Sequence, residues 1–237
     1  MTVRAHLKEL DRECAELCRR HDHLSPDGIL NFRLLYSSVE TFEASESVMF
    51  LGTNPGGDCR QASQAHRWIP FQQQNWSAYL DEDWNGHALQ IAAREVARLF
   101  ADHGESGKDV LRRSPSGNLV PFRSRKGVSK LPWALRDLSF GIRLIQLTRP
   151  RTLIIFASNQ GHWQQLMKAL DRPLRPTWCN RLDASGFTFR ESVAVADAAP
   201  RHVFALPGLN QRKWARNREV IDILYMRLLD LDAATAR

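Results

Sequence analysis

An amide, a carboxylate and several residues with special backbone properties stand together in one short stretch of the sequence. Asn54 and Asp58 occur in the segment Gly52–Asp58, which also contains a proline and three glycines and directly follows the apolar residues 48–51. A buried strand that stops at such a sequence is expected to enter a tight loop, where proline fixes the backbone and glycine lets it approach a ligand closely. Ligand sites of α/β proteins lie at the carboxyl ends of parallel strands. The stretch therefore predicts an active-site loop, although a plain strand-to-helix connection explains the same turn residues equally well.

The elements that must position this loop alternate between strands and helices. Apolar runs predict strands at residues 47–53, 118–122, 152–157 and 202–206. Because these runs are apolar almost throughout, the strands are expected to be buried on both faces, as in a parallel sheet between helix layers. A period of 3.6 residues predicts helices at residues 3–20, 86–103, 132–147, 160–170 and 214–231. The sequence thus predicts an α/β fold, a three-layer α/β/α sandwich around a central, mainly parallel four-stranded sheet.

The domain organisation follows from what the sequence does not contain. No repeat, low-complexity tract or linker interrupts it, so we expect a single domain over residues 1–237, with the N-terminal helical segment 1–46 packed on it. A chain of this length can bury a sizeable core. Residues 171–197 fit neither pattern clearly, and either a hairpin or an irregular excursion would accommodate them.

Basic residues gather in two tracts that contain no acid. The chain has a net charge of +7, with seven basic residues between Arg112 and Arg136 and five between Arg201 and Arg218. Such tracts can neutralise phosphates, which makes nucleic acid the expected partner if they flank the loop after residue 51. An ordinary solvated basic face is the alternative.

Other features concern compartment and cofactors. No apolar run approaches the ~20 residues of a membrane helix, and residues 1–8 resemble no secretory signal. The four cysteines, Cys14, Cys18, Cys59 and Cys179, show no CxxC spacing, which indicates reduced thiols. The histidines show no metal-ligand spacing either. We therefore expect a cytoplasmic protein without membrane contact, metal or cofactor, and nothing in the sequence indicates more than a monomer.

Distinctive loops follow three of the expected strands: Gly52-Thr53-Asn54-Pro55-Gly56, the segment Pro121–Lys126, and Pro207-Gly208-Leu209-Asn210. Their order and spacing, over about Val48–Trp214, resemble the uracil-DNA glycosylase superfamily. Its members open with a Gly-x-(Asp/Asn/Ala)-Pro loop, carry a base-reading Asn in mid-chain and close with a Pro-Ser or Pro-Gly loop that enters DNA. The first loop looks closest to the mismatch-specific and single-strand-selective branches, which also have Asn at this place.

The resemblance implies roles for individual residues. Breaking the bond between base and deoxyribose creates positive charge on the sugar and negative charge on the base. The enzyme must place a water molecule, stabilise the sugar cation and accept the base anion through hydrogen bonds. Asn54 matches the residue that positions this water. An amide can orient water but cannot deprotonate it, so Asn54 would not act as a base. Asp58 would act as base or cation stabiliser, unless it caps a helix.

Asn118 would read a pyrimidine edge, unless it is a turn residue. Phe71 would stack on the base, unless it packs in the core or Trp68 takes that place. The remaining pocket residues of this interpretation are Gly52, Thr53, Pro55, Gly56 and Gly57.

The same resemblance assigns the basic loops to DNA. Leu209 or Asn210 would be the wedge that enters the duplex, with cationic side chains on the phosphates, whereas ordinary basic loops are the alternative. The residues expected to contact DNA are Arg123, Arg125, Lys126, Pro207, Gly208, Leu209, Asn210, Arg212 and Lys213.

Two departures from the family pattern bear on the substrate. Leu206-Pro207-Gly208 lacks the histidine with which many members stabilise the base anion, and Gly56-Gly57 places no bulk where uracil enzymes block a 5-substituent. Both departures point away from a strict uracil enzyme and toward an open pocket, which would suit a bulky base such as glucosylated hydroxymethylcytosine in anti-phage defence. Because the catalytic loop contains no lysine, a Schiff-base lyase step is not expected. The cysteine spacing of the branches with an iron–sulfur cluster is absent.

The sequence therefore predicts a monofunctional DNA glycosylase that leaves an abasic site, in DNA repair or in phage defence. Two other interpretations stay open. The chain could be a catalytically silent DNA-binding protein of the same fold, for which the missing histidine argues. It could also be an unrelated α/β enzyme for free nucleosides or nucleotides, although such small substrates do not require basic tracts around the pocket.

Overall fold

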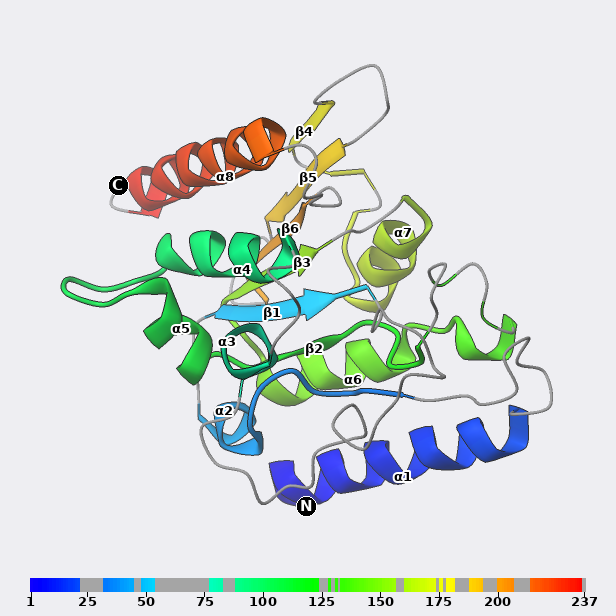
Figure 1. Ribbon diagram of the computed structural model, residues 1–237. Helices are drawn as coiled ribbons and strands as arrows, with labels where there is room; N and C mark the ends of the chain where they lie inside the picture. The colour runs from blue at the N-terminus through cyan, green and yellow to red at the C-terminus, as the bar shows by residue number, and fades with distance from the viewer. Residues whose placement is uncertain are drawn as a thin grey trace.

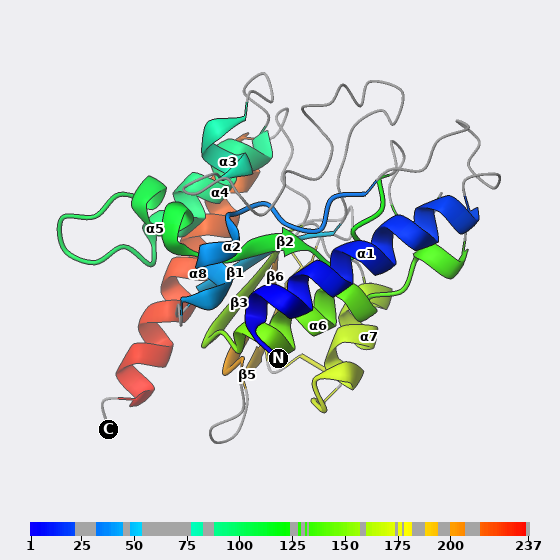
Figure 2. The same cartoon turned by 90° about the horizontal axis from the view of Figure 1, so that it is seen from below.

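A computed structural model shows helices on both sides of one twisted sheet (Figures 1 and 2). It describes residues 1–21, 32–44, 48–53, 77–82, 88–123, 128, 131, 133–156, 160–173, 175–176, 178–181, 188–193, 200–206 and 214–235. The helices are α1 (Val3–His21), α2 (Val39–Glu43), α3 (Ala78–Asp81), α4 (Ala88–Arg98), α5 (Gly107–Arg113), the 3-10 turn η5 (Trp133–Leu135), α6 (Ser139–Thr148), α7 (Gln160–Ala169) and α8 (Trp214–Thr235). The strands are β1 (Val48–Gly52), β2 (Ser116–Asn118), β3 (Thr152–Phe156), β4 (Trp178–Arg181), β5 (Thr188–Val193) and β6 (His202–Leu206).

Within the described residues, six strands form a single mixed sheet in the order β2-β1-β3-β6-β5-β4. The first four of this order run parallel, whereas β5 and β4 form a hairpin that pairs antiparallel with β6. The α/β class and the mainly parallel character of the sheet are thus confirmed, but the expected count of four strands is wrong. The four predicted strands make the parallel part, and residues 171–197, which the pattern left open, supply β4 and β5.

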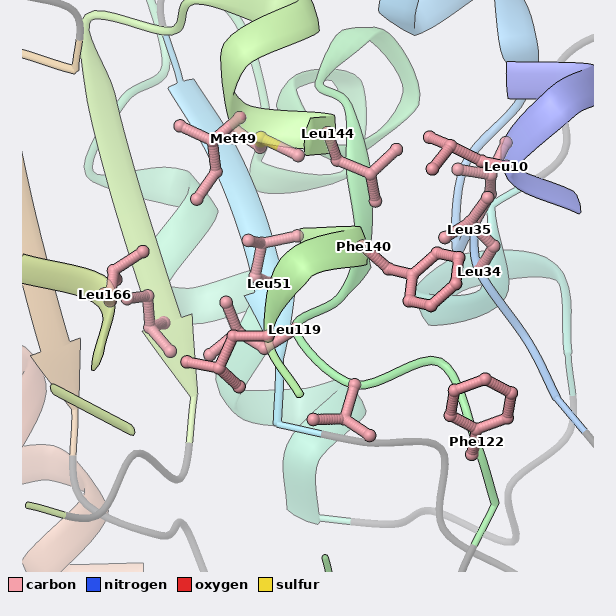
Figure 3. Close-up of a cluster of buried hydrophobic side chains, with 14 of the residues drawn as sticks. Leu10, Leu34, Leu35, Met49, Leu51, Leu119, Phe122, Phe140, Leu144 and Leu166 are labelled. Atoms are coloured by element: carbon pink, nitrogen blue, oxygen red, sulfur yellow. The ribbon is translucent and has the colours of Figure 1, made fainter. Parts of the chain in front are cut away.

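The parallel strands are buried on both faces, because alternate side chains enter two different cores. Met49 and Leu51 of β1 belong to one cluster, with residues of α1, α6 and α7. Figure 3 shows both pointing toward Phe140 and Leu144 of α6. Val48 and Phe50 belong to the other cluster, with residues of α3, α4, α5 and α8. Two helix layers therefore enclose the sheet.

Helix α1 covers the first of these faces through a stripe at three- and four-residue spacing. Leu7, Leu10, Cys14 and Cys18 are buried, which confirms the amphipathic helix and the interpretation of the two cysteines as small core residues. Burial raises the pKa of the Cys14 thiol far above its ordinary value, so this cysteine is an unreactive packing residue.

The second strand is displaced from its predicted position. The apolar run 118–122 was expected to form it, yet β2 occupies Ser116–Asn118 and pairs with Phe50–Gly52. The reason is space: a Cβ on Gly117 would lie 2.7 Å from the Leu34 carbonyl oxygen and 3.1 Å from the Leu144 side chain. Only a small residue fits where the sheet edge is covered this closely.

The predicted helix at residues 132–147 is also divided in two. The turn η5 ends at Leu135, and α6 begins at Ser139, whose backbone N–H donates to the Asp137 carboxylate at 3.2 Å. This local bond favours a new helix start over a continuous helix. As a result, Trp133 does not join the apolar face of α6 as its spacing suggested; it is 84% exposed.

Candidate functional site

The sheet order places a topological switch point at the carboxyl ends of β1 and β3. From β1 the chain moves to β2 on one side and then to β3 on the other, so the switch point of the topology lies between β1 and β3. Ligands of open α/β sheets bind outside the strands at such a point. The Thr53 hydroxyl, which follows β1, donates to the Phe156 carbonyl oxygen at the end of β3, at 2.9 Å. This bond connects the two strand ends across the switch point.

The chain after β2 is attached to the same edge. The backbone N–H of Leu119 donates to the Gly52 carbonyl oxygen and that of Val120 to the Thr53 carbonyl oxygen, both at 2.9 Å. Three of the predicted pocket residues, Gly52, Thr53 and Asn118, are therefore brought together at one end of the sheet, with Gly52 and Asn118 as register partners.

Asn118 is the most informative of these residues. Its side chain is fully buried, and Nδ2 donates to the Arg33 carbonyl oxygen at 3.0 Å. Since that carbonyl can only accept, the bond fixes which end of the amide is the NH2 group. Oδ1 is then the other end, and within the part of the chain that the structure describes it has no hydrogen-bond partner. A buried amide oxygen without a donor costs free energy, so an acceptor is held ready at the carboxyl end of β2.

Gly52 makes room for this acceptor. A Cβ at position 52 would lie 2.8 Å from Asn118 Oδ1, closer than real Cβ atoms come to such an atom. The first glycine of the Gly-x-Asn-Pro motif therefore has a steric role toward Asn118, besides any role in the loop. The alternative interpretation of Asn118 as a turn residue is wrong, because it ends a strand.

A second layer of residues, which sequence reasoning missed, lies next to β2 and holds the Asn118 side chain in place. Residues 32–37 run antiparallel to β2 and its extension, through the bridges Phe32↔Phe122 and Leu35↔Gly117. They bring in Arg33, whose carbonyl holds the Asn118 amide and whose guanidinium makes a bidentate pair with Glu82, one bond at 2.8 Å. The only signal for this segment was a single arginine within the apolar run 32–36.

Aromatic and amide groups fix this second layer in place. The Arg33 guanidinium lies 4.8 Å from the centre of the Tyr36 ring, which packs edge-on against Tyr79. Burial raises the pKa of the Tyr36 phenol, and the neighbouring guanidinium opposes that rise. Gln90, itself buried, donates to the carbonyl oxygens of Ala78 and Glu82. The support of Asn118 is thus a packed and hydrogen-bonded network.

The basic tract Arg112–Arg136 divides into different roles. Arg112 pairs with Asp81 at 3.1 Å and Arg113 with Glu105 at 2.7 Å, so these two cations are engaged by protein carboxylates. Arg123, predicted to contact DNA, is only 8% exposed. It lies just beyond the carboxyl end of β2, close in sequence to the site, but its burial argues against a direct phosphate contact.

The other predicted site residues lie outside the described residues. They are Asn54, Pro55, Gly56, Gly57, Asp58, Phe71, Arg125, Lys126, Pro207, Gly208, Leu209, Asn210, Arg212 and Lys213. The ends of the strands that precede two of these loops are described: β1 leads into residues 54–58 and β6 into residues 207–213.

Among the residues that the structure describes, no group of three or more His, Cys, Asp or Glu side chains could hold a metal ion. No helix in the described part is long and apolar enough to cross a membrane. None of the protein-family models compared with the sequence matches it, and neither does any curated protein.

Proposed function

We propose that the protein is a monofunctional DNA glycosylase that removes an aberrant or modified pyrimidine from DNA. The observation that carries the proposal is the Asn118 carboxamide at the carboxyl end of β2, next to β1, held by its NH2 end and with its oxygen unpartnered among the described residues. The NH2 end donates to the Arg33 carbonyl oxygen and also hydrogen-bonds the Tyr36 side chain, so Oδ1 is the atom left for a ligand. Both pyrimidines present a donor on their pairing edge, N3–H in uracil and the 4-amino group in cytosine, which this acceptor can bind.

The reaction would use the loop that continues from Gly52 and Thr53. In this proposal Asn54 orients a water molecule toward C1′ of the flipped nucleotide, and Asp58 stabilises the sugar cation or accepts the proton of that water. The N-glycosidic bond breaks with its electron pair on the base, the water oxygen bonds to C1′, and the base leaves with a proton. An abasic site remains in the DNA.

The substrate class follows from the glycines. Gly56 and Gly57 carry no side chain at the sequence positions where uracil enzymes block a 5-substituent, which favours a bulky modified cytosine over uracil alone. Phage defence would then be the biological setting, with ordinary repair as the setting if uracil is cleaved.

A base-release assay tests the proposal. Labelled single- and double-stranded oligonucleotides would carry uracil, a thymine mismatch, hydroxymethyluracil or glucosylated hydroxymethylcytosine, and alkali would break any abasic site. We expect release of at least one of these bases. Asn54→Ala should abolish it, and Asn118→Ala should lower kcat/KM about 5- to 150-fold, the value of one good edge contact.

Two glycine variants provide a matched pair. Gly52→Ala should abolish base release because its Cβ displaces Asn118 Oδ1. Gly104→Ala introduces the same methyl group at φ 87°, with nothing within 4 Å of it, so it should cost roughly 1–2 kcal/mol of stability and leave base release unchanged. Salt-sensitive DNA binding without release of any base would favour the catalytically silent DNA-binding protein instead.

A further inference from the structure

Trp133 is held out into solvent by a turn that is otherwise anchored in the core. Its side chain is 84% exposed, while Leu131 and Leu135 on either side are 3% and 1% exposed, and Leu138 is fully buried. Among the large apolar side chains that the structure describes as exposed, it is the most exposed aromatic one. An indole on a fixed support presents a flat apolar surface at little cost in conformational entropy.

Hydrogen bonds define the turn that carries it. The backbone N–H of Leu131 donates to the Val128 carbonyl oxygen at 3.0 Å, and that of Arg136 to the Trp133 carbonyl oxygen at 3.1 Å. The Arg136 side chain closes the turn through Nε, which donates to the Leu131 carbonyl oxygen at 2.7 Å. The guanidinium of this exposed arginine is therefore kept next to the turn, with its remaining N–H groups available to solvent.

The sequence that leads to Trp133 and Arg136 is basic. Residues 124–136 contain four basic residues and no acid, and Asp137, the first acid beyond them, is engaged with the Ser139 N–H. In both views the green turn of η5 lies beside the carboxyl-terminal end of α1 (Figures 1 and 2), whose last turn holds Arg19, His21 and Arg20, the last of them paired with Glu16. The segment leaves the sheet at Arg123, just after β2, on the edge that holds Asn118.

We propose that Trp133 is a stacking platform for an unpaired base of single-stranded DNA, with the Arg136 guanidinium on a phosphate. An aromatic face within a cationic surface is the combination that binds single strands without sequence preference. Stacking needs a base whose face is open, so duplex DNA should gain little from the indole. The inference rests on DNA as the partner in the proposed function, but it does not depend on catalysis.

Binding of the full chain to a labelled oligothymidylate of about 20 nucleotides, longer than a site of ~4–16 nucleotides, provides the test. Affinity would be measured between about 50 and 200 mM salt, beside a duplex of equal length. Trp133→Ala should weaken single-strand binding about 5- to 100-fold and leave the salt dependence unchanged, since the indole contacts no phosphate. Trp133→Phe should retain most of the affinity. Arg136→Ala should lower the salt slope by about 0.7, the value of one phosphate contact on a single strand.

Tyr225→Ala is the matched control, because Tyr225 is an aromatic side chain of α8, 50% exposed and outside the basic segment. It should bind like the unaltered chain. Unchanged single-strand affinity in Trp133→Ala would overturn the inference, as would an equal loss on duplex DNA or an equal loss in Tyr225→Ala. Base release by the unaltered chain is measured separately. If the unaltered chain releases no base but Trp133→Ala loses single-strand binding, the proposed function is refuted and the stacking platform is supported.

Discussion

Two bidentate arginine–glutamate pairs lie in different regions of the molecule, and they bury opposite charges. In the pair Arg33–Glu82, beside the candidate site, the arginine side chain is 5% exposed and the glutamate 13%. In the pair Arg227–Glu191, between α8 and β5, the arginine is 24% exposed and the glutamate 0%. The same kind of ion pair therefore neutralises a buried cation in one region and a buried anion in the other.

The pairs also differ in what they are attached to. Arg33 holds Asn118 through its carbonyl oxygen and packs on Tyr36, so its position decides where the candidate base-reading amide lies. Arg227 has a second carboxylate partner, Asp230, on its own helix, and its contacts join α8 to the antiparallel edge of the sheet. The comparison teaches that a buried pair can serve site geometry or only stability, and variants can separate the two.

The largest effect is expected for Arg227→Met. The substitution leaves the Glu191 carboxylate fully buried without its cationic partner, which should lower the free energy of unfolding by about 3–5 kcal/mol. Urea denaturation measures this loss. Base release, assayed well below the unfolding transition, should not change.

Arg112→Met controls for the loss of an arginine as such. Its pair with Asp81 is partly exposed, at 47% and 28%, so the substitution should cost at most about 1 kcal/mol. If Arg227→Met were no more destabilising than this control, the buried carboxylate would not need its partner and the comparison would fail.

Glu82→Gln should have a smaller effect on stability and a larger one on the site. Arg33 keeps its bond to the Leu35 carbonyl oxygen and its contact with the Tyr36 ring, so the loss should fall at the lower end of the range, about 3 kcal/mol. Because a shift of Arg33 moves the group that holds Asn118, kcat/KM for base release should fall while Arg227→Met retains it. Equal activity of the two variants, each measured on fully folded protein, would show that Arg33 has no part in positioning the amide.

Sequence reasoning was most successful where a single physical effect dominates. Three of the four apolar runs gave parallel strands at their predicted places, and β6 at 202–206 matches its prediction to the residue. It was less successful where tertiary contacts decide. Ser116 and Gly117 have no apolar pattern, yet they form β2 through their pairing with β1 and with Leu35, and the Leu34 backbone and the Leu144 side chain leave space only for a small residue at position 117.

The candidate site shows the same division. Gly52, Thr53 and Asn118 could be predicted to meet, since strand ends of a parallel sheet converge and the spacing of the loops is distinctive. Arg33 could not, because its role depends on residues 32–37 lying antiparallel to β2, a pairing between segments about 80 residues apart in sequence. The exposure of Trp133 was missed for a related reason: its spacing matches the apolar face of α6, but the helix begins after it.

Asp11 extends the comparison to a carboxylate without any arginine, and it gives the smallest expected effect. Among the described residues, no group donates to the buried Oδ1 of this α1 side chain, and burial raises the pKa of the Asp11 carboxyl group to about 6. In the unfolded chain the group ionises near pH 4. Between these two pH values the folded state holds the proton more often than the unfolded chain does. The free energy of unfolding therefore falls as the pH rises from about 4 to about 6 and stays lower above that.

Asp11→Asn removes this titration while keeping the shape of the side chain. The variant should therefore match the unaltered chain at pH 4 and exceed its stability by about 1–2 kcal/mol at pH 7, a gain reduced by the partial solvent exposure of the group. Urea denaturation across this pH range measures the difference, and a difference that does not change with pH would show that Asp11 is not the unpaired carboxylate that its surroundings indicate.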